Sequence, residues 1–408
     1  MRILYNLGIA IYSMGVRAAA ACGHTKAKQM CAGWKTMKSE LLSMNLGKGT
    51  TAWFHASSLG EFEQARPVIE ALKKEHPEYK IVVTFFSPSG YEIRKNYDLA
   101  DYICYLPMDT PGNAKRFVDT IQPQVVYFVK YDFWYNYMRA IKDSGAQMYI
   151  FSTIFRPNQY FFKWYGGWFR KQLRLFDHLF VQNQESLQLL KKAGIEQCSI
   201  AGDTRFDRVH DITMAAKEFK EIEAFADGKP VVMAGSSWEP DEAQLKQYLD
   251  NTKVDLKLIV APHMIHEEHL QKIEALFGKE NCVRFTRLTP KENYRQILII
   301  DTMGMLSAMY RYATVAYIGG GFGQGIHNIL EALTFGKPVV FGPRYQKFQE
   351  AHDIIALGGG KSYNEQTELK QCLDEWLCNN EQYTKASQTC KDYVEGNLGA
   401  AKTILGKK

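Results

Sequence analysis

The chain has 408 residues, of which 46% are hydrophobic and 23% are charged, with only 13 prolines. This length exceeds what one hydrophobic core usually serves, so it predicts two domains. The composition excludes a disordered or fibrous protein, and a mean hydropathy of -0.30 excludes a membrane protein with many spans.

The formal charge of +6 is concentrated at the N-terminus. Residues 1–39 contain no acidic residue and six basic residues, namely Arg2, Arg17, Lys26, Lys28, Lys35 and Lys38. The remaining 369 residues hold 44 basic and 44 acidic residues. Because this body is neutral, the charge argues against a protein that binds nucleic acid.

The first predicted element is the apolar run 3–16, which ends at Arg17. The run is shorter than the roughly 20 residues that cross a bilayer. It could be a signal peptide, a buried first helix, or a helix lying in or dipping into a membrane. A signal peptide fits poorly because no clear small-residue cleavage site follows. The membrane interpretation also explains the basic residues, so we expect a membrane-associated segment over residues 1–39.

Beyond residue 50, short β-branched or aromatic runs alternate with helical periods. Strands are predicted at 51–58, 81–86, 102–106, 125–129, 148–152 and 178–182, and again at 231–234, 256–261, 297–300, 315–318 and 339–341. Such alternation predicts an α/β protein with two parallel, doubly wound sheets. Two domains of this kind that face each other would form a deep cleft for ligands.

These patterns also suggest domain boundaries. We expect a first Rossmann-like domain at 40–206, a polar linker at 207–229 and a second Rossmann-like domain at 230–370. The helical text at 371–408 would pack back on the first domain.

The first candidate site is the block 55–61, at the end of the first predicted strand. Ser58 and Glu61 have the spacing of a capping box, in which the glutamate accepts a backbone N–H bond at the start of a helix. Glu61 also follows Gly60 at the carboxyl edge of a strand, where it could act as a general base. The pattern alone favours the cap.

The second candidate site is the glycine-rich run 318–328, which leads into the helical text 329–335. Glycines let the backbone approach a ligand, and a helix N-terminus offers N–H groups to a phosphate. The run fits neither the dinucleotide-binding G-x-G-x-x-G motif nor a P-loop. Glu331, one turn after Asn328, either compensates the helix dipole or accepts hydrogen bonds from ribose hydroxyls.

Three histidines, His263, His266 and His269, follow the predicted strand 256–261. Their spacing suggests metal ligands, but H-E-x-x-H is absent and the three positions drift too far around a helix to converge. The eight cysteines are scattered, with no C-x-x-C pair and no zinc-like spacing, so we expect no metal site. A disulfide framework is improbable in a chain this large and rich in core residues, which favours a reducing compartment.

The stretch 154–176 contains five basic residues, nine aromatic residues and no acidic residue. One interpretation is an aromatic core helix. The other is a surface for an anionic amphiphile or a membrane interface. Stacking on nucleic acid would need a basic domain around this stretch.

Seven blocks, in their order and spacing, resemble the 3-deoxy-D-manno-oct-2-ulosonic acid (Kdo) transferases of lipopolysaccharide synthesis. They are WFHASSLGE (53–61), FWYN (133–136), GDTRFD (202–207), AGSSW (234–238), APH (261–263), DTMG (301–304) and HNILE (327–331). The resemblance covers nearly the whole chain, and it implies that the domain at 40–206 binds the acceptor and that the domain at 230–370 binds the CMP-sugar donor. It implies a GT-B fold with a membrane-associated N-terminal segment, CMP-Kdo as donor, and a lipid A precursor as acceptor at the cytoplasmic face of the inner membrane. It implies no cofactor, because a nucleoside monophosphate leaving group has no diphosphate for a metal to chelate.

The resemblance also implies site residues. The family's general base corresponds to Glu61, and Asp132 preserves the second acid of a Glu-Thr-Glu-Leu-Trp-Pro-Asn block. Arg205 replaces a family lysine and keeps its positive charge. The family's donor contacts correspond to Pro262, His263, Met303, Gly304, Met305, Asn328, Ile329, Leu330 and Glu331.

Three positions depart from the family pattern. Lys130 and Met305 stand where the family has glutamates, and His263 stands where it has an arginine. The resemblance implies an inverting glycosyltransferase. Two alternatives are another GT-B sugar-nucleotide enzyme, such as a UDP-sugar transferase or an epimerase, and a membrane-surface binding protein that has lost activity.

Overall fold

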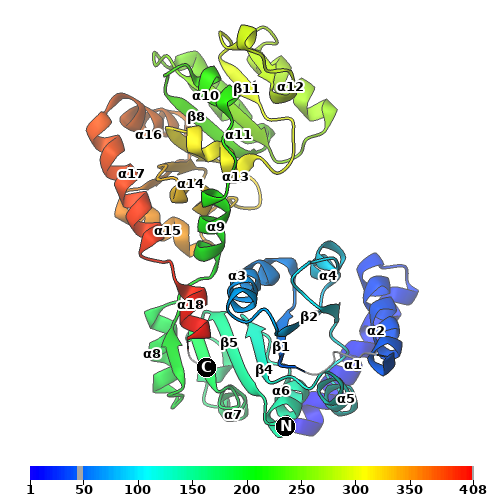
Figure 1. Cartoon of the computed structure of the whole chain (residues 1–408). Helices are drawn as coiled ribbons and strands as arrows, with labels where there is room; N and C mark the ends of the chain where they lie inside the picture. The colour runs from blue at the N-terminus through cyan, green and yellow to red at the C-terminus, as the bar shows by residue number, and fades with distance from the viewer. Residues whose placement is uncertain (44–48, 407–408) are drawn as a thin grey trace. The chain divides into compact units, whose positions relative to one another are not determined.

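The computed structural model describes residues 1–43 and 49–406. Residues 44–48 and 407–408, which fall within the predicted domains 40–206 and 371–408, lie outside this description, as do the side chains of Lys38, Leu42 and Ser43. The chain forms two compact units, Met1–Arg208 with Leu398–Lys408, and Val209–Asn397. Each unit has one seven-stranded sheet between layers of helices (Figure 1). The predicted α/β fold with two doubly wound sheets is confirmed.

In the first unit the strand order is β3-β2-β1-β4-β5-β6-β7, and all neighbouring strands are parallel. The strands are β1 (Thr51–Ala56), β2 (Lys80–Phe85), β3 (Tyr102–Tyr105), β4 (Val125–Val129), β5 (Gln147–Thr153), β6 (His178–Val181) and β7 (Cys198–Ile200). Both β1 and β4 are buried along their whole length, because helices cover both faces of the sheet. The strand order reverses between β1 and β4, and ligands bind at the carboxyl ends of strands at such a switch point.

Helices on the first sheet pack their apolar faces against it. One face contacts α3 (Leu59–Glu75) and α18 (Ala400–Leu405), and the other contacts α5 (Pro111–Ile121), α6 (Tyr135–Ser144) and α7 (Gly167–Leu173). The remaining helices of this part are α1 (Arg2–Ala21), α2 (Thr25–Ser43), α4 (Pro88–Arg94), η1 (Tyr160–Phe162), α8 (Gln184–Lys192) and α9 (Arg205–Met214). In α3, Ala65, Val68, Ile69 and Leu72 are buried as their helical spacing predicts.

In the second unit the strand order is β10-β11-β9-β8-β12-β13-β14, again all parallel. The strands are β8 (Val231–Ser237), β9 (Lys257–Pro262), β10 (Cys282–Arg284), β11 (Ile297–Ile299), β12 (Val315–Ile318), β13 (Val339–Phe341) and β14 (Gly360–Ser362). The helices used below are α10 (Lys220–Ala226), α11 (Glu239–Asn251), α12 (Glu267–Phe277), α13 (Leu306–Met309), α14 (Leu330–Thr334), α15 (Gln349–Leu357), α16 (Gln366–Cys378) and α17 (Asn380–Glu395). The switch point of this sheet lies between β8 and β12.

Some predicted boundaries were wrong. The stretch 207–229 is not an irregular linker, because it contains most of α9 and all of α10, whose Ile222 and Phe225 are buried. The helices α16 and α17 belong to the second unit, where they pack on α11 and α14, and only α18 packs on α3. Asp207 anchors that return by accepting the N–H groups of Gly399 and Ala401 at 2.6 and 2.8 Å.

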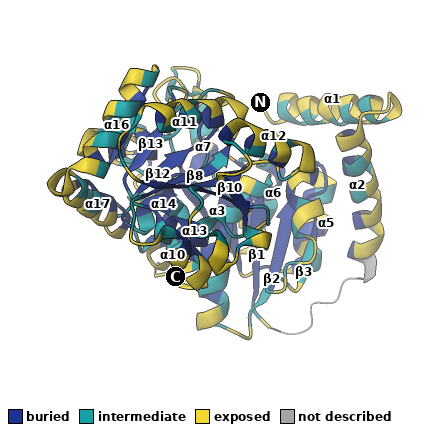
Figure 2. Ribbon diagram, turned by 90° about the horizontal axis from the view of Figure 1, so that it is seen from above, coloured by how far each residue is buried: buried dark blue, intermediate teal, exposed yellow. Residues whose placement is uncertain are grey.

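The N-terminal helix α1 is the most exposed large element (Figure 2). The predicted run 3–16 lies within this helix of 20 residues, none of which is buried. By length and composition alone, α1 is long and apolar enough to cross a membrane. Both interpretations of the stretch 154–176 hold in part, because Trp164 and Tyr165 are 93% and 55% exposed while Phe155, Phe161 and Phe176 are buried.

Candidate active site

Glu61 lies in the first turn of α3, directly beyond the carboxyl end of β1. The N–H of Ser58 donates to Glu61 Oε2 at 3.0 Å, so the predicted cap is present. Burial raises the pKa of Glu61 above its usual range. The positive charge of Lys130 and the N–H groups of Ser57 and Ser58 lower this pKa and so offset part of the rise. A carboxylate with a raised pKa is a stronger base than an exposed one. Capping therefore does not exclude a catalytic role.

Asp132 follows β4, the strand next to β1 at the switch point. The hydroxyl of Ser57 donates to Asp132 Oδ1 at 2.6 Å. Asp132 Oδ2 is buried and has no hydrogen-bond partner among the residues that the structure describes. Burial and the negative charge of Glu61 raise the pKa of Asp132 well above its usual range. The two carboxyl groups thus share one electrostatic environment, in which each negative charge disfavours the other.

A buried histidine connects two of the blocks that the sequence presents separately. The indole N–H of Trp134 donates to His55 Nε2 at 3.0 Å. This bond requires the imidazole proton to sit on Nδ1, which lies 2.8 Å from Thr84 Oγ1. Burial lowers the pKa of His55 to about 3, so the ring is neutral. Its Nε2 lies 3.5 Å from Asp132 Oδ2, which places the ring against the carboxyl pair.

Sequence reasoning did not assign a role to His55, Thr84 or Trp134. Their contacts explain why the blocks at 53–61 and 133–136 occur together, because each supplies one partner of the same buried bond. The only advance signal was the order of the blocks along the chain.

Arg205 lies at the start of α9 and is oriented by Asp203. Its Nε donates to Asp203 Oδ2 at 2.8 Å, and Asp203 Oδ1 accepts from Gln64 Nε2 at 3.0 Å. Gln64 lies in α3, three residues after Glu61. Glu61 and Arg205 are therefore linked through the first two turns of one helix, and Asp132 contacts Ser57 just before that helix.

In the second unit, three aromatic rings stack at the carboxyl edge of the sheet. His263 lies between Trp238 and His327, with ring centroids 4.7 and 4.5 Å away. The indole N–H of Trp238 donates to His327 Nε2 at 3.1 Å, which fixes the proton of His327 on Nδ1. Burial and the neighbouring His263 lower the pKa of His327. His263 itself is exposed, directly after Pro262 at the end of β9.

The remaining predicted donor residues form two adjoining segments. The turn containing Met303, Gly304 and Met305 joins β11 to α13, and Met303 is 80% exposed. Ser307, in the first turn of α13, donates to Glu331 Oε2 at 2.9 Å. Asn328 Nδ2 donates to Glu331 Oε1 at 3.2 Å, as their spacing predicts. Burial raises the pKa of Glu331.

The helix after the glycine-rich run, α14, is shorter than the predicted range 329–335. It has five residues, and the N–H of Leu330 is already bonded to Asn328 Oδ1 at 3.1 Å. The side chains of Ile329 and Leu330 are buried in the core, so only their backbone could contact a ligand. Gly319 is required by packing, because a Cβ there would lie 2.2 Å from the carbonyl oxygen of Ser236.

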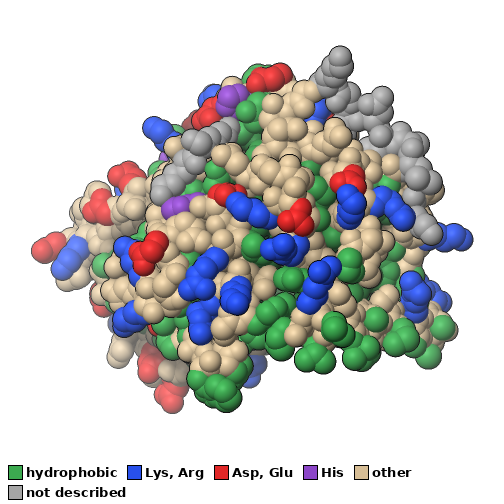
Figure 3. All heavy atoms as spheres, turned by 90° about the horizontal axis from the view of Figure 1, so that it is seen from below, with side chains coloured by type: hydrophobic (Ala, Val, Ile, Leu, Met, Phe, Trp, Pro, Cys, Tyr) green, Lys and Arg blue, Asp and Glu red, His purple; other side chains and the backbone are tan. Residues whose placement is uncertain are grey.

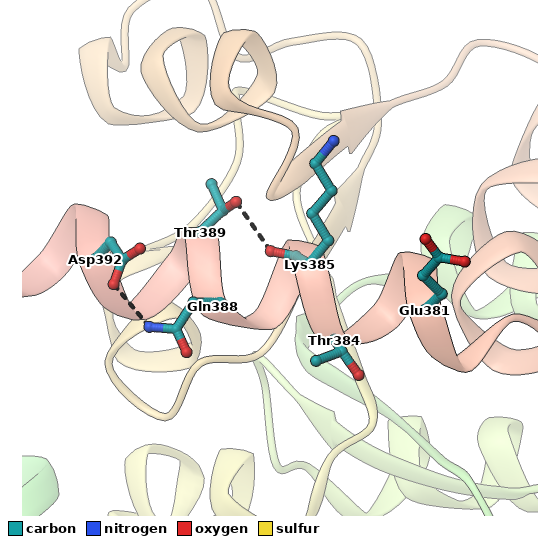
Figure 4. A pocket seen from close by; sticks show the side chains of 6 residues that line it. All are labelled: Glu381, Thr384, Lys385, Gln388, Thr389 and Asp392. Atoms are coloured by element: carbon teal, nitrogen blue, oxygen red, sulfur yellow. Dashed lines mark hydrogen bonds between the residues drawn. The ribbon is translucent and has the colours of Figure 1, made fainter.

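Two other features lie outside the candidate site. Among residues 1–43 and 49–406, no group of three His, Cys, Asp or Glu side chains is placed to hold a metal ion, and His269 instead contacts Glu242 at 3.0 Å. A shallow hollow lies over the outer face of α17 (Figure 4). There Gln388 bonds to Asp392 and Thr389 bonds to the Lys385 carbonyl, as on any solvated helix.

Comparison with known proteins identifies the relatives of this chain. A family model described as 3-deoxy-D-manno-octulosonic-acid transferase (kdotransferase) matches residues 27–208. A 3-deoxy-D-manno-octulosonic acid transferase of Aquifex aeolicus is 27% identical over 332 residues, which cover 80% of this chain and 85% of that protein. The protein of the same name from Chlamydophila psittaci is 26% identical over 328 residues, covering 77% and 74%.

Solved structures share the fold at low sequence identity. A UDP-GlcNAc 2-epimerase from Neisseria meningitidis superposes with a TM-score of 0.61 at 16% identity, covering 88% of this chain and 99% of that one. MurG of Acinetobacter baumannii gives a TM-score of 0.55 at 12% identity, covering 88% and 100%. These likenesses show the GT-B fold. The family match over residues 27–208 and the named relatives show that this chain is similar to the Kdo transferases, which are glycosyltransferases of lipopolysaccharide biosynthesis.

Proposed function

We propose that the protein transfers Kdo from CMP-Kdo to the sugar of a lipid A precursor, with inversion at the anomeric carbon. The observation that carries this proposal is the half-buried carboxylate of Glu61, whose raised pKa fits a general base. The similarity to Kdo transferases suggests the sugar, and the aromatic and acidic residues at the carboxyl edge of the second sheet fit a nucleotide.

In this reaction Glu61 takes the proton of an acceptor hydroxyl as that oxygen attacks the anomeric carbon of Kdo. The bond between that carbon and the phosphate oxygen breaks, and CMP leaves with the electron pair. Burial and the negative charge of Glu61 raise the pKa of Asp132, which favours its neutral form. The positive charge of Lys130 lowers the pKa of Glu61 and so favours the ionised form that a base needs.

The donor would be held by residues of the second unit. Exposed His263 and the backbone of the turn at Met303–Met305 would contact the phosphate and base, and Glu331 would accept hydrogen bonds from the ribose. Arg205 would neutralise the charge that develops on the leaving phosphate. Each of these assignments follows a position of the family's motif, although His263, Met305 and Arg205 differ from the family's residues at their positions.

The acceptor is a lipid, so the protein would work at a membrane surface. The first unit carries six basic and no acidic residues over 1–39, together with the basic and aromatic stretch 154–176. Figure 3 shows hydrophobic side chains along one border of a face, with Lys and Arg side chains beside them. Both features favour binding to anionic phospholipids at the cytoplasmic face of the inner membrane.

Mass spectrometry of a lipid A precursor incubated with CMP-Kdo and the protein tests the proposal. A product heavier by one or more Kdo residues is expected. An unchanged acceptor, with protein that CMP stabilises against heat, would refute transfer to this acceptor. Stabilisation by UDP but not by CMP would favour the other sugar-nucleotide enzymes, and stabilisation by neither would favour a binding protein without activity.

A further inference from the structure

The helix α1 presents its apolar side away from the protein. Five large apolar side chains point outward and are 82, 63, 55, 56 and 60% exposed, namely Ile3, Leu4, Leu7, Ile11 and Met14, which we call the outer ridge. Their spacing places them on one side of a helix of 3.6 residues per turn. A helix on a protein surface in water normally shows the reverse pattern. The outer ridge therefore requires an apolar environment outside the protein.

The opposite side of α1 is attached to the first unit by polar contacts. The hydroxyl of Tyr5 donates to Asp109 Oδ2 at 2.5 Å and accepts the N–H of Tyr135 at 3.3 Å. The side-chain amide of Asn136 donates to Asn6 Oδ1 at 2.9 Å. These bonds hold the first two turns of α1 against the loop before α5 and the start of α6.

Further contacts hold the rest of the helix. The ring of Tyr12 stacks on Phe86 at 6.0 Å, two turns after Tyr5. After α1 the chain turns into α2, where Ala27 and Met30 are buried and the indole of Trp34 donates to the Leu106 carbonyl at 3.1 Å. The helix is thus attached near its start, at its middle and beyond its end.

This attachment opposes a membrane-spanning orientation, although α1 is long enough to span. If α1 crossed a bilayer, the parts of the first unit that touch it would enter the hydrocarbon. A hollow beside its start is lined by charged side chains, including Arg2, Lys115, Asp119, Arg139 and Asp143. Charges in the hydrocarbon core are strongly unfavourable. A helix lying along the interface instead exposes only the outer ridge to acyl chains.

A second group of exposed apolar side chains lies near α1. Trp164 is 93% exposed and Tyr165 is 55% exposed, between η1 and α7. Trp168 of α7 packs on Tyr5 at 5.9 Å, so this loop and α1 belong to one surface. Tryptophan and tyrosine are enriched at membrane interfaces. Lys163 and Lys171 flank the loop and suit anionic headgroups, whereas Arg170 donates to the carbonyls of Phe161 and Lys163 and so fixes the loop.

We propose that α1 lies flat in the interface of an anionic phospholipid bilayer. Its outer ridge inserts among the acyl chains, Trp164 and Tyr165 form the second contact, and both ends of α1 face the same side of the membrane. This inference rests on the proposed membrane acceptor and adds the orientation in which the first unit meets that membrane.

Thiol labelling of the full chain in sealed membrane vesicles tests the orientation. Cys22 is exposed just after α1, and Arg2→Cys adds a second thiol at its start. Each is labelled separately, with the exposed Cys378 and the partly exposed Cys31 and Cys372 replaced by Ser. A membrane-impermeant maleimide should label both positions in inverted vesicles and neither in right-side-out vesicles. Labelling of the two positions from opposite sides would overturn the proposal.

A paired substitution tests the outer ridge. Leu7 and Leu357 are both 55% exposed, but Leu357 lies in α15 of the second unit. Leu7→Asp should weaken binding to vesicles containing phosphatidylglycerol at least about tenfold, whereas Leu357→Asp should leave it within about twofold. Equal effects would overturn the role of the ridge. If the unaltered protein failed to bind such vesicles, the membrane association itself would be refuted. In that case, transfer of Kdo to a deacylated, water-soluble acceptor would show that the catalytic proposal still holds.

Discussion

The buried bond between Trp134 and His55 is expected to stabilise the first unit and can be removed with little change of shape. Trp134→Phe keeps an aromatic ring beside Phe86, whose centroid lies 4.7 Å away, but it removes the N–H that His55 Nε2 accepts. His55 is fully buried, so this nitrogen loses its partner away from water. Leaving a buried acceptor unsatisfied costs about 1–3 kcal/mol.

In a unit of this size, each kcal/mol shifts the melting midpoint by about 2–4 °C. Trp134→Phe should therefore lower the midpoint of the first unit by about 4–8 °C at a cost of about 2 kcal/mol, as measured by scanning calorimetry. Trp164→Phe is the matched control, because that ring is 93% exposed and should leave the midpoint unchanged. Equal midpoints for the two variants would refute the inference that this buried bond is stabilising.

Three further predictions concern charge in the proposed site. Because burial raises the pKa of Glu61, kcat/KM for the acceptor should fall as the pH drops through a pKa above that of an exposed glutamate. The positive charge of Lys130 lowers this pKa, so Lys130→Met should move the acidic limb of the pH–rate profile to higher pH. His263→Arg should tighten CMP binding at pH 8 by roughly tenfold in calorimetric titration, because it adds a permanently charged donor. Arg205→Ala should lower turnover by about 10²-fold, whereas Arg205→Lys, which keeps the charge, should lose little.

Most of the fold could be predicted from the sequence because its strands are long, buried runs. Val125–Val129 and Val315–Ile318 were predicted with the correct ends. The strands that the sequence did not predict are β7, β10 and β14, each of three residues and each at the edge of a sheet. An edge strand buries fewer side chains, so its hydrophobic pattern is weaker.

The candidate site could be predicted only in part. Glu61 and Asp132 were singled out, but their coupling arises from the pairing of β1 with β4, which no local pattern specifies. The stack around His263 depends on residues from three separate loops and was not expected. The prediction of free N–H groups after the glycine-rich run was wrong at Leu330, because this N–H donates to Asn328 Oδ1.

The most direct test of the account is the turnover of Glu61→Gln beside Glu63→Gln. Both positions lie in the first two turns of α3, but Glu63 bonds to Arg94 at 2.7 Å and has no proposed part in the reaction. With CMP-Kdo and a lipid A precursor, Glu61→Gln should lower turnover by about 10²–10⁴-fold without weakening CMP binding, and Glu63→Gln should retain most activity. Near-normal turnover of Glu61→Gln would contradict the assignment of Glu61 as the general base.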